Sequence, residues 1–234
     1  MTTATIAKTE SAVEASLWHV VKLHHVDWET YCKLRDEPAN DHIRMSYLDG
    51  ELILMSPEYL RDDGAERLGL LVRGATSAFG LTVKGIRTTT LRKATGQSKG
   101  SGKEPDNAFY LGANERWIRR YLKEGKLDLE VAPPPDLAIE VDHTRDSEVA
   151  LPIYARLGVP EVWRYDVRKA TLWFGRLDGN DYREVDRSVA LPRLTPALVL
   201  QALQTFDAGD MDENAWHDWI KDWARNLPEA PEQG

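Results

Sequence analysis

The chain has 234 residues, of which 42% are hydrophobic and 29% charged, a composition typical of a globular protein. Its formal net charge of −8 argues against a dedicated nucleic-acid coat protein but allows an enzyme that meets nucleic acid through one basic patch. The sequence has no apolar run near the ~20 residues that span a bilayer, and its single cysteine, Cys32, excludes an intramolecular disulfide, so we expect no membrane association and a cytoplasmic location.

The length fits one domain with short appendages. Residues 1–16 lack the basic start and apolar core of a secretory signal, so we expect a disordered leader there. The main domain is expected over residues 17–205 and a C-terminal helical tail over residues 206–234.

The first half of the chain alternates strand and helix signals. Residues 43–55 predict a β-hairpin, because Asp49-Gly50 is a turn signal between two β-prone runs. Asp62 or Asp63 is expected to cap a helix that runs to about Phe79. Two short strands are expected over residues 81–92, followed by a flexible, basic, Gly/Ser-rich loop over residues 94–103.

Two acids sit on the strands that follow. Asp106 comes after a proline and begins an apolar strand over residues 106–111, and a short helix is expected between Asn114 and Lys126. The next strand, residues 136–142, alternates acids with apolar residues, so Glu140 points to one face. A carboxylate in mid-strand is costly to bury unless it has a partner or binds a metal. The two strand-borne acids therefore suggest a divalent-metal site.

The second half predicts a helix from about residue 148 to Leu157, then strands over residues 161–167, 170–177 and 181–185. Residues 211–226 predict a helix with a stripe of tryptophans at helical spacing, which we expect to dock on the protein's own core or on a partner subunit. The order of elements indicates a mixed α/β domain around one central sheet. The stripe is Trp216, Trp219 and Trp223.

Five segments resemble, in this order, the Uma-type family of putative restriction-endonuclease-like proteins within the PD-(D/E)xK nuclease superfamily. The resemblance implies a restriction-endonuclease-like core, in which a central mixed β-sheet is flanked by helices and carries a metal site at its edge. The segments are RMSYLDGELILMSP (44–57), RTTTLRK (87–93), EPDNAFYL (104–111), PPPDLAIEVD (133–142) and LPIYARLGVPEVWRYD (151–166).

The resemblance also implies a site for Mg²⁺ or Mn²⁺. Asp106 and Glu140 match the metal-binding acids, and Val141 would add its backbone carbonyl. Hard cations prefer such oxygen ligands, and they activate water and neutralise charge on phosphate, so DNA is the implied substrate. Asp62 would be the assisting upstream acid, with Asp63 or Glu51 as alternatives.

The chain departs from the nuclease pattern at its lysine. The position two residues after the glutamate holds Asp142, and the alternative position on the following helix holds Ala150. Arg145 is the nearest basic residue on the same segment and is our candidate for the missing catalytic cation. Basic residues on neighbouring strands could also reach the site: Lys84, Arg87, Arg92, Lys93 and Lys103.

Other polar residues admit two interpretations. Asp136 is expected to organise the start of its strand rather than bind metal, whereas Asp142 and His143 are either accessory ligands or a solvated strand end. The basic loop is a candidate for contact with DNA phosphates. Its contributing residues would be Arg92, Lys93, Lys99 and Lys103.

Three functions follow from these features. The first is a metal-dependent DNA endonuclease. The second is a catalytically degenerate nuclease fold that binds nucleic acid or mediates oligomerisation, and the third is a protein-interaction domain, which the acidic net charge permits. A homodimer is also expected, by analogy with nucleases that cut two strands and from the tryptophan-rich tail.

Overall fold

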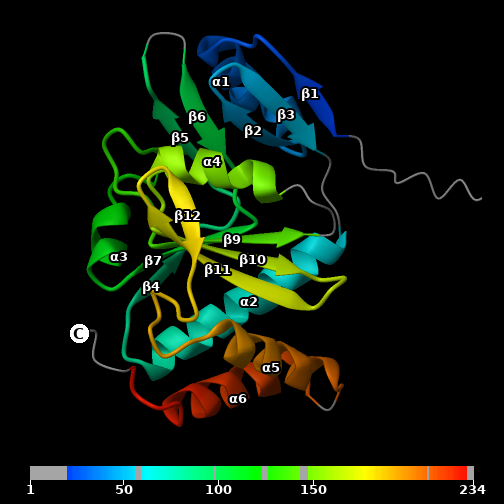
Figure 1. Ribbon diagram of the computed structural model, residues 1–234, viewed down its shortest axis with the longest axis vertical. Coiled ribbons are helices and arrows are strands. Elements are labelled where there is room, and N and C mark those ends of the chain that lie inside the picture. The colour runs from blue at the N-terminus through cyan, green and yellow to red at the C-terminus, as the bar shows by residue number, and fades with distance from the viewer. Residues whose placement is uncertain are drawn as a thin grey trace, which may run out of the picture.

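Two six-stranded sheets form the scaffold of the computed structural model, and helix α4 (Ser147–Leu157) packs between them (Figure 1). The structure describes residues 20–55, 59–96, 99–122, 126–142, 147–209 and 211–230, with the backbone alone at 59–62 and 147–149. The predicted leader, residues 1–16, lies outside this part of the chain. The mixed α/β class is confirmed, with a second sheet that the sequence did not reveal.

The N-terminal sheet has the strand order β1-β3-β2-β6-β5-β8. All its pairs are antiparallel except β5 with β8. Helix α1 (Trp28–Asp36) and the short 3-10 helix η1 (Pro38–Asn40) accompany this sheet. The strands are β1 (Val21–Leu23), β2 (Arg44–Leu48), β3 (Glu51–Met55), β5 (Thr90–Ala94), β6 (Gly100–Lys103) and β8 (Lys126–Asp128).

The second sheet has the order β12-β11-β10-β9-β7-β4 and is the mixed sheet that the sequence predicts. Strands β9 and β10 are parallel and all other neighbours are antiparallel. The three predicted strands after α4 are confirmed as β10, β11 and β12. The bounds are β4 (Val83–Gly85), β7 (Asn107–Leu111), β9 (Leu137–Asp142), β10 (Glu161–Asp166), β11 (Thr171–Asp178) and β12 (Asp181–Glu184).

Helices cover both faces of this second sheet. The long helix α2 (Tyr59–Ala78) packs on one face, with α5 (Pro196–Asp207) and α6 (Glu213–Arg225) on the same side, and α4 packs on the other face. The short helix α3 (Ala113–Ile118) follows β7. The side chains of β9 alternate between the two cores, because Ile139 and Val141 join the α2 side while Ala138 joins the α4 side.

Local signals placed several elements correctly. The hairpin is confirmed, and its turn uses positive φ at Asp49 (45°) and Gly50 (106°), the combination that a two-residue turn between twisted strands requires. Helix α2 is confirmed too, but it begins at Tyr59. Asp62 and Asp63 therefore lie inside the helix rather than at its cap.

The flexible loop predicted over residues 94–103 is wrong in part. Strand β5 extends to Ala94 and strand β6 begins at Gly100, so half of the Gly/Ser-rich segment is paired sheet. The glycines of β6 serve close packing, because a Cβ at Gly100 would strike the Trp28 ring and one at Gly102 would strike the Tyr31 ring. These rings are part of the buried aromatic cluster of the N-terminal sheet.

Replacing Gly102 with valine is expected to destabilise the fold by about 3 kcal/mol, because the new side chain must displace the buried Tyr31 ring. Chemical denaturation measures this loss. Ser101→Ala is the matched control on the same strand: its buried hydroxyl has no partner among the described residues, so its removal should be neutral or stabilising. An equal loss for both variants would contradict the packing explanation.

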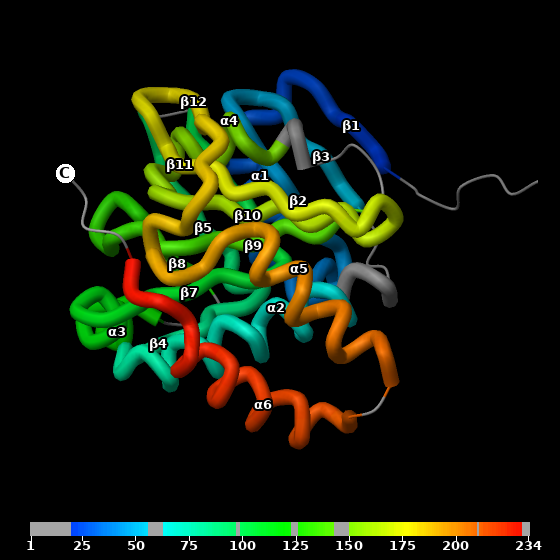
Figure 2. Tube along the Cα trace, turned by 60° about the horizontal axis from the view of Figure 1, so that its bottom comes forward, coloured from blue at the N-terminus to red at the C-terminus, as the bar shows by residue number. Residues whose placement is uncertain are grey.

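The C-terminal helices belong to the same core as the sheet. Helix α5, which the sequence did not predict, crosses the expected boundary between residues 205 and 206. Helix α6 lies against α2, as Figure 2 shows, and Trp216 is fully buried there. Trp219 and Trp223 stack on each other and pack against this core. The stripe thus docks on the protein's own core, and it offers less apolar surface for the predicted homodimer than expected.

Candidate metal and phosphodiester site

The register of β7 against β9 places the two predicted acids opposite each other. Asn107 pairs with Ile139 in this antiparallel ladder, so the next positions outward are Asp106 and Glu140. One Asp106 oxygen, Oδ2, accepts a hydrogen bond of 2.9 Å from the backbone N–H of Val141. The structure therefore brings together two carboxylates that are more than thirty positions apart in the chain.

Glu140 points into the space between the two sheets. It is 2% exposed, and its Oε1 accepts a short hydrogen bond from the Tyr154 hydroxyl of α4. The same oxygen lies 3.2 Å from the Lys103 ammonium nitrogen, which belongs to β6 of the other sheet. A lysine that the nuclease motif does not place thus stands beside the strand glutamate.

Lys103 is 3% exposed and does not serve as the exposed phosphate contact that the sequence suggested. Its Nζ also donates a hydrogen bond of 3.1 Å to the backbone carbonyl of Glu104. An isolated charge in such a place would be very costly to bury, and the contact with Glu140 offsets part of that cost. Lys103 was one of five basic residues that we expected could reach the site. The alternation of side chains along one sheet could not distinguish it from the others, because it lies in the other sheet.

Tyr154 completes this cluster from α4. Burial raises the pKa of its hydroxyl well above the ordinary value, and the negative charge of Glu140 raises the pKa further. The hydroxyl therefore stays protonated and donates to Glu140. Ala150 lies one helical turn before Tyr154 and is buried on the same side of α4, so the alternative position at which the resemblance places a lysine faces the same region.

A second cation flanks the glutamate on the neighbouring strand. Arg164 of β10 pairs in register with Glu140, and its Nη2 lies 3.5 Å from Asp142 Oδ2. Asp142 is buried, so it is not a solvated strand end. Its role as an accessory ligand stays a prediction.

Glu104 anchors the segment that carries both Lys103 and Asp106, a role that sequence reasoning missed. Its carboxylate accepts hydrogen bonds from the Met45 backbone N–H at 3.0 Å and from the Thr90 hydroxyl at 3.2 Å. Arg35 of α1 lies 3.4 Å from the same carboxylate, with both side chains buried. The connection between the two sheets is therefore held at one point by α1, β2 and β5.

Several predicted residues lie elsewhere or outside the described residues. The side chain of Asp62, and all of His143 and Arg145, fall outside them. The alternative acids form ion pairs with other residues, Asp63 with Arg67 at 2.9 Å and Glu51 with Lys22 at 2.7 Å. The carbonyl of Val141 as a metal ligand stays a prediction.

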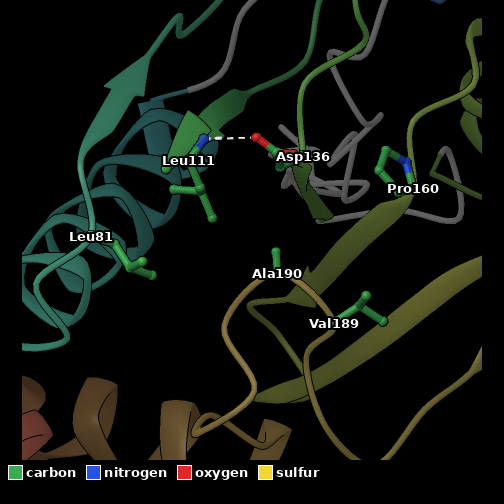
Figure 3. Close-up of a pocket in the computed structure, with 7 residues that line it drawn as sticks. Leu81, Leu111, Asp136, Pro160, Val189 and Ala190 are labelled. Atoms are coloured by element: carbon green, nitrogen blue, oxygen red, sulfur yellow. Dashed lines mark hydrogen bonds between the residues drawn. The ribbon is translucent and has the colours of Figure 1, made fainter. Parts of the chain in front are cut away.

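Asp136 organises the opposite end of β9, as expected. It accepts hydrogen bonds of 2.7 Å from the Leu111 backbone N–H and from the Asn114 side chain. Figure 3 shows this contact beside a pocket of about 320 Å³, across which Val189 and Ala190 face Asp136. Burial raises the pKa of this carboxyl, and the Leu111 N–H opposes that shift.

Two of the four residues predicted to contact DNA are used inside the protein. Arg92 lies 2.5 Å from Asp36 and over the Tyr31 ring, and Lys103 is buried as described. Lys93 donates to the Arg156 carbonyl at 3.4 Å, and Lys99 is exposed. An extended basic loop surface is therefore not formed by these four residues.

A solvent-facing cleft of about 290 Å³ reaches Asp106 from outside. Helix α2, strand β2, and the connection between β4 and β5 supply its walls. The lining residues are Arg44, Ala65, Glu66, Arg87, Thr88, Asp106 and Asn107. The described residues contain no group of three or more His, Cys, Asp or Glu side chains that could hold a metal. Carboxylate oxygens nevertheless suit a hard cation such as Mg²⁺, and of the two predicted acids Asp106 lines this cleft.

A comparison with models of protein families shows which family the chain belongs to. The family model Uma2, described as "Putative restriction endonuclease", matches residues 28–209. The chain belongs to the Uma2 family. The Uma2 match includes both acids, Lys103 and Tyr154, as well as all of α5.

Other comparisons add little to the Uma2 assignment. A crystal structure of a putative nuclease belonging to DUF820 from Anabaena variabilis matches with a TM-score of 0.42 and 14% identity, over 77% of this chain and 90% of that chain. The search of curated proteins returned no match. Among the helices of the described residues, none has the length and apolarity needed to cross a membrane.

Proposed function

We propose that this Uma2 protein is a metal-dependent endonuclease that hydrolyses DNA phosphodiester bonds. The observation that carries the proposal is the buried Lys103–Glu140 ion pair, formed where β7 and β9 place Asp106 opposite the glutamate. Two acids and a lysine are the groups that this nuclease superfamily uses. Here the lysine lies on β6 of the N-terminal sheet. The motif instead places it two residues after the glutamate, on β9 of the second sheet.

In this proposal Asp106 and Glu140 hold Mg²⁺ or Mn²⁺. When bound, the ion would lower the pKa of a bound water and neutralise charge that builds on the phosphate. Tyr154 and the Val141 N–H orient the two carboxylates by donating to them. The buried Lys103 ammonium, which contacts Glu140 and donates to the Glu104 carbonyl, would supply positive charge beside the metal-binding carboxylates.

A second function is favoured by one detail of the same cluster. Glu140 Oε1 already has two partners from the protein, Lys103 and Tyr154, so this oxygen has contacts without a metal. A degenerate nuclease fold that binds nucleic acid without cutting it would need nothing more. A cytoplasmic location and a homodimer remain expectations under either function, and light scattering tests the homodimer.

Cleavage of plasmid and single-stranded DNA with Mg²⁺, with Mn²⁺ and with EDTA tests the endonuclease. Asp106→Asn and Glu140→Gln are each expected to lower the rate by more than about 100-fold. Calorimetric titration of Mn²⁺ should show weaker binding in both variants. Asp136→Asn is the matched control, because it removes a carboxylate just before β9, at the end of this strand that lies away from Glu140.

Two results would contradict the assignment. Cleavage that survives in the Asp106→Ala/Glu140→Ala double variant would show that the catalytic site lies elsewhere. A wild-type protein that binds DNA but neither binds metal nor cleaves would support the degenerate fold instead.

A further inference from the structure

The cleft beside Asp106 is lined by two arginines, Arg44 and Arg87. Arg44 of β2 donates from Nη1 to the carbonyl of Pro105 at 3.3 Å, which places its guanidinium at the residue before Asp106. Arg87 lies on the opposite wall, between β4 and β5. The lining of the cleft thus contains two arginines together with the carboxylates of Asp106 and Glu66.

The Arg87 backbone is fixed in a turn, while its side chain forms an exposed ion pair. The turn around it is closed by backbone hydrogen bonds of 2.9 Å from Ile86 to Ala108 and 3.0 Å from Thr89 to Ile86. Arg87 itself has a positive φ of 46°, a conformation that non-glycine residues seldom adopt outside functional or turn positions. Its side chain is 65% exposed. The turn thus presents a guanidinium to solvent at a defined place beside the cleft.

Glu66 of α2 holds that guanidinium at present. The Arg87 Nη2 lies 2.6 Å from Glu66 Oε2, and both side chains are substantially exposed. Exposed ion pairs of this kind are weak, so another anion that enters the cleft can replace Glu66 as the partner of Arg87. A phosphodiester carries one negative charge shared by two non-bridging oxygens, in a geometry that a guanidinium fork contacts well.

The size of the cleft limits what can enter. Its volume of about 290 Å³ is at the lower end of the ~300–1,000 Å³ of ordinary small-molecule sites. One backbone phosphate with its sugar fits such a space, whereas a duplex must lie across the mouth. The exposed hydroxyl residue Thr88 stands next to Arg87 at that mouth.

We propose that this cleft binds one phosphodiester unit of the DNA backbone, with Arg87 as a phosphate contact and Glu66 as its intramolecular competitor. The proposal rests on the proposed endonuclease function for its choice of substrate. Arg44 positions the chain before Asp106 and adds positive charge to the inner wall. When the phosphate binds, the Arg87 guanidinium leaves the Glu66 carboxylate and contacts the substrate instead.

The test is DNA binding under conditions without cleavage. A fluorescein-labelled 20-base-pair duplex is titrated with the full chain in EDTA and in Ca²⁺, at several salt concentrations, and followed by anisotropy. Arg87→Ala is expected to raise Kd by about 10-fold and to reduce the slope of log K against log salt by about one. Glu66→Gln is expected to lower Kd, because Arg87 no longer has a competing partner.

A second exposed ion pair supplies the matched control. Arg225 and Asp222 of α6 lie 2.5 Å apart, so Arg225→Ala and Asp222→Asn change the net charge by the same amounts away from the cleft. Both variants should leave Kd and the salt slope unchanged. If they shift binding as much as the Arg87 and Glu66 variants do, net charge explains the effect and the cleft assignment is overturned.

The outcomes separate this inference from the endonuclease proposal. Opposite shifts for Arg87→Ala and Glu66→Gln support the cleft even in a protein that does not cleave. Cleavage that depends on Asp106 and Glu140, together with unchanged binding in Arg87→Ala, retains the endonuclease and overturns the cleft. A single-stranded RNA of the same length serves as a competitor. If it bound more tightly than both single-stranded and double-stranded DNA, the choice of DNA as the ligand would be overturned.

Discussion

Replacing Lys103 by methionine is expected to destabilise the protein by about 3–5 kcal/mol, because the Glu140 carboxylate is then left buried without its cation. Methionine fills a similar volume, so the loss reports the charge rather than a cavity. Chemical denaturation in EDTA measures the free energy of unfolding. DNA cleavage by the same variant should fall by at least about 100-fold.

A double-mutant cycle isolates the pair. Glu140→Gln alone is also expected to be destabilising, since Lys103 then has no counter-ion, whereas Lys103→Met/Glu140→Gln should lose much less than the sum of the two single variants. Lys169→Met is the control: Lys169 forms an exposed ion pair with Asp166, and its loss should cost less than about 1 kcal/mol. Additive losses in the cycle would show that Lys103 and Glu140 do not depend on each other.

Moving the lysine from β6 to α4 should restore a large part of what its removal destroys. Ala150 lies one turn before Tyr154, whose hydroxyl already contacts Glu140, so a lysine at this position can reach the space that Lys103 leaves. Lys103→Ala is expected to lower cleavage by at least about 100-fold. Lys103→Ala/Ala150→Lys should return cleavage to within about 10-fold of wild type.

Denaturation gives a second readout of the same exchange, since the relocated ammonium should also recover stability. Ala155→Lys in the Lys103→Ala background is the control, because residue 155 follows Tyr154 directly and points to another side of α4. Restoration by Ala155→Lys as well would indicate that any added positive charge suffices. A relocated variant that is folded but neither more stable nor more active than Lys103→Ala would show that the amine must come from β6.

The elements that the sequence predicted well are those that depend on neighbouring residues. The Asp49-Gly50 turn, the apolar face of α2 and the alternation along β9 are all local, and the structure contains them. The pairing of Asp106 with Glu140 also followed from local signals, once the two acids were placed on adjacent strands.

The elements that failed depend on contacts between distant segments. The segment ATGQSKGSGK has the composition of a loop, and only the rings of Trp28 and Tyr31 above it explain why glycine belongs in a buried strand. For the same reason, the sequence could not distinguish Lys103 from the other four basic residues that could reach the site. Its partner lies in the other sheet, and no periodicity within either segment carries that information.

The origin of Lys103 in the N-terminal sheet has a consequence for how relatives are sorted. A filter that demands a lysine at the positions of Asp142 or Ala150 would discard this chain as an inactive descendant. A filter that asks whether any lysine amine lies beside the strand glutamate would retain this chain, because Lys103 from the other sheet lies beside Glu140. Degenerate members of such a family are better separated from competent ones by side-chain proximity than by the order of letters in a motif.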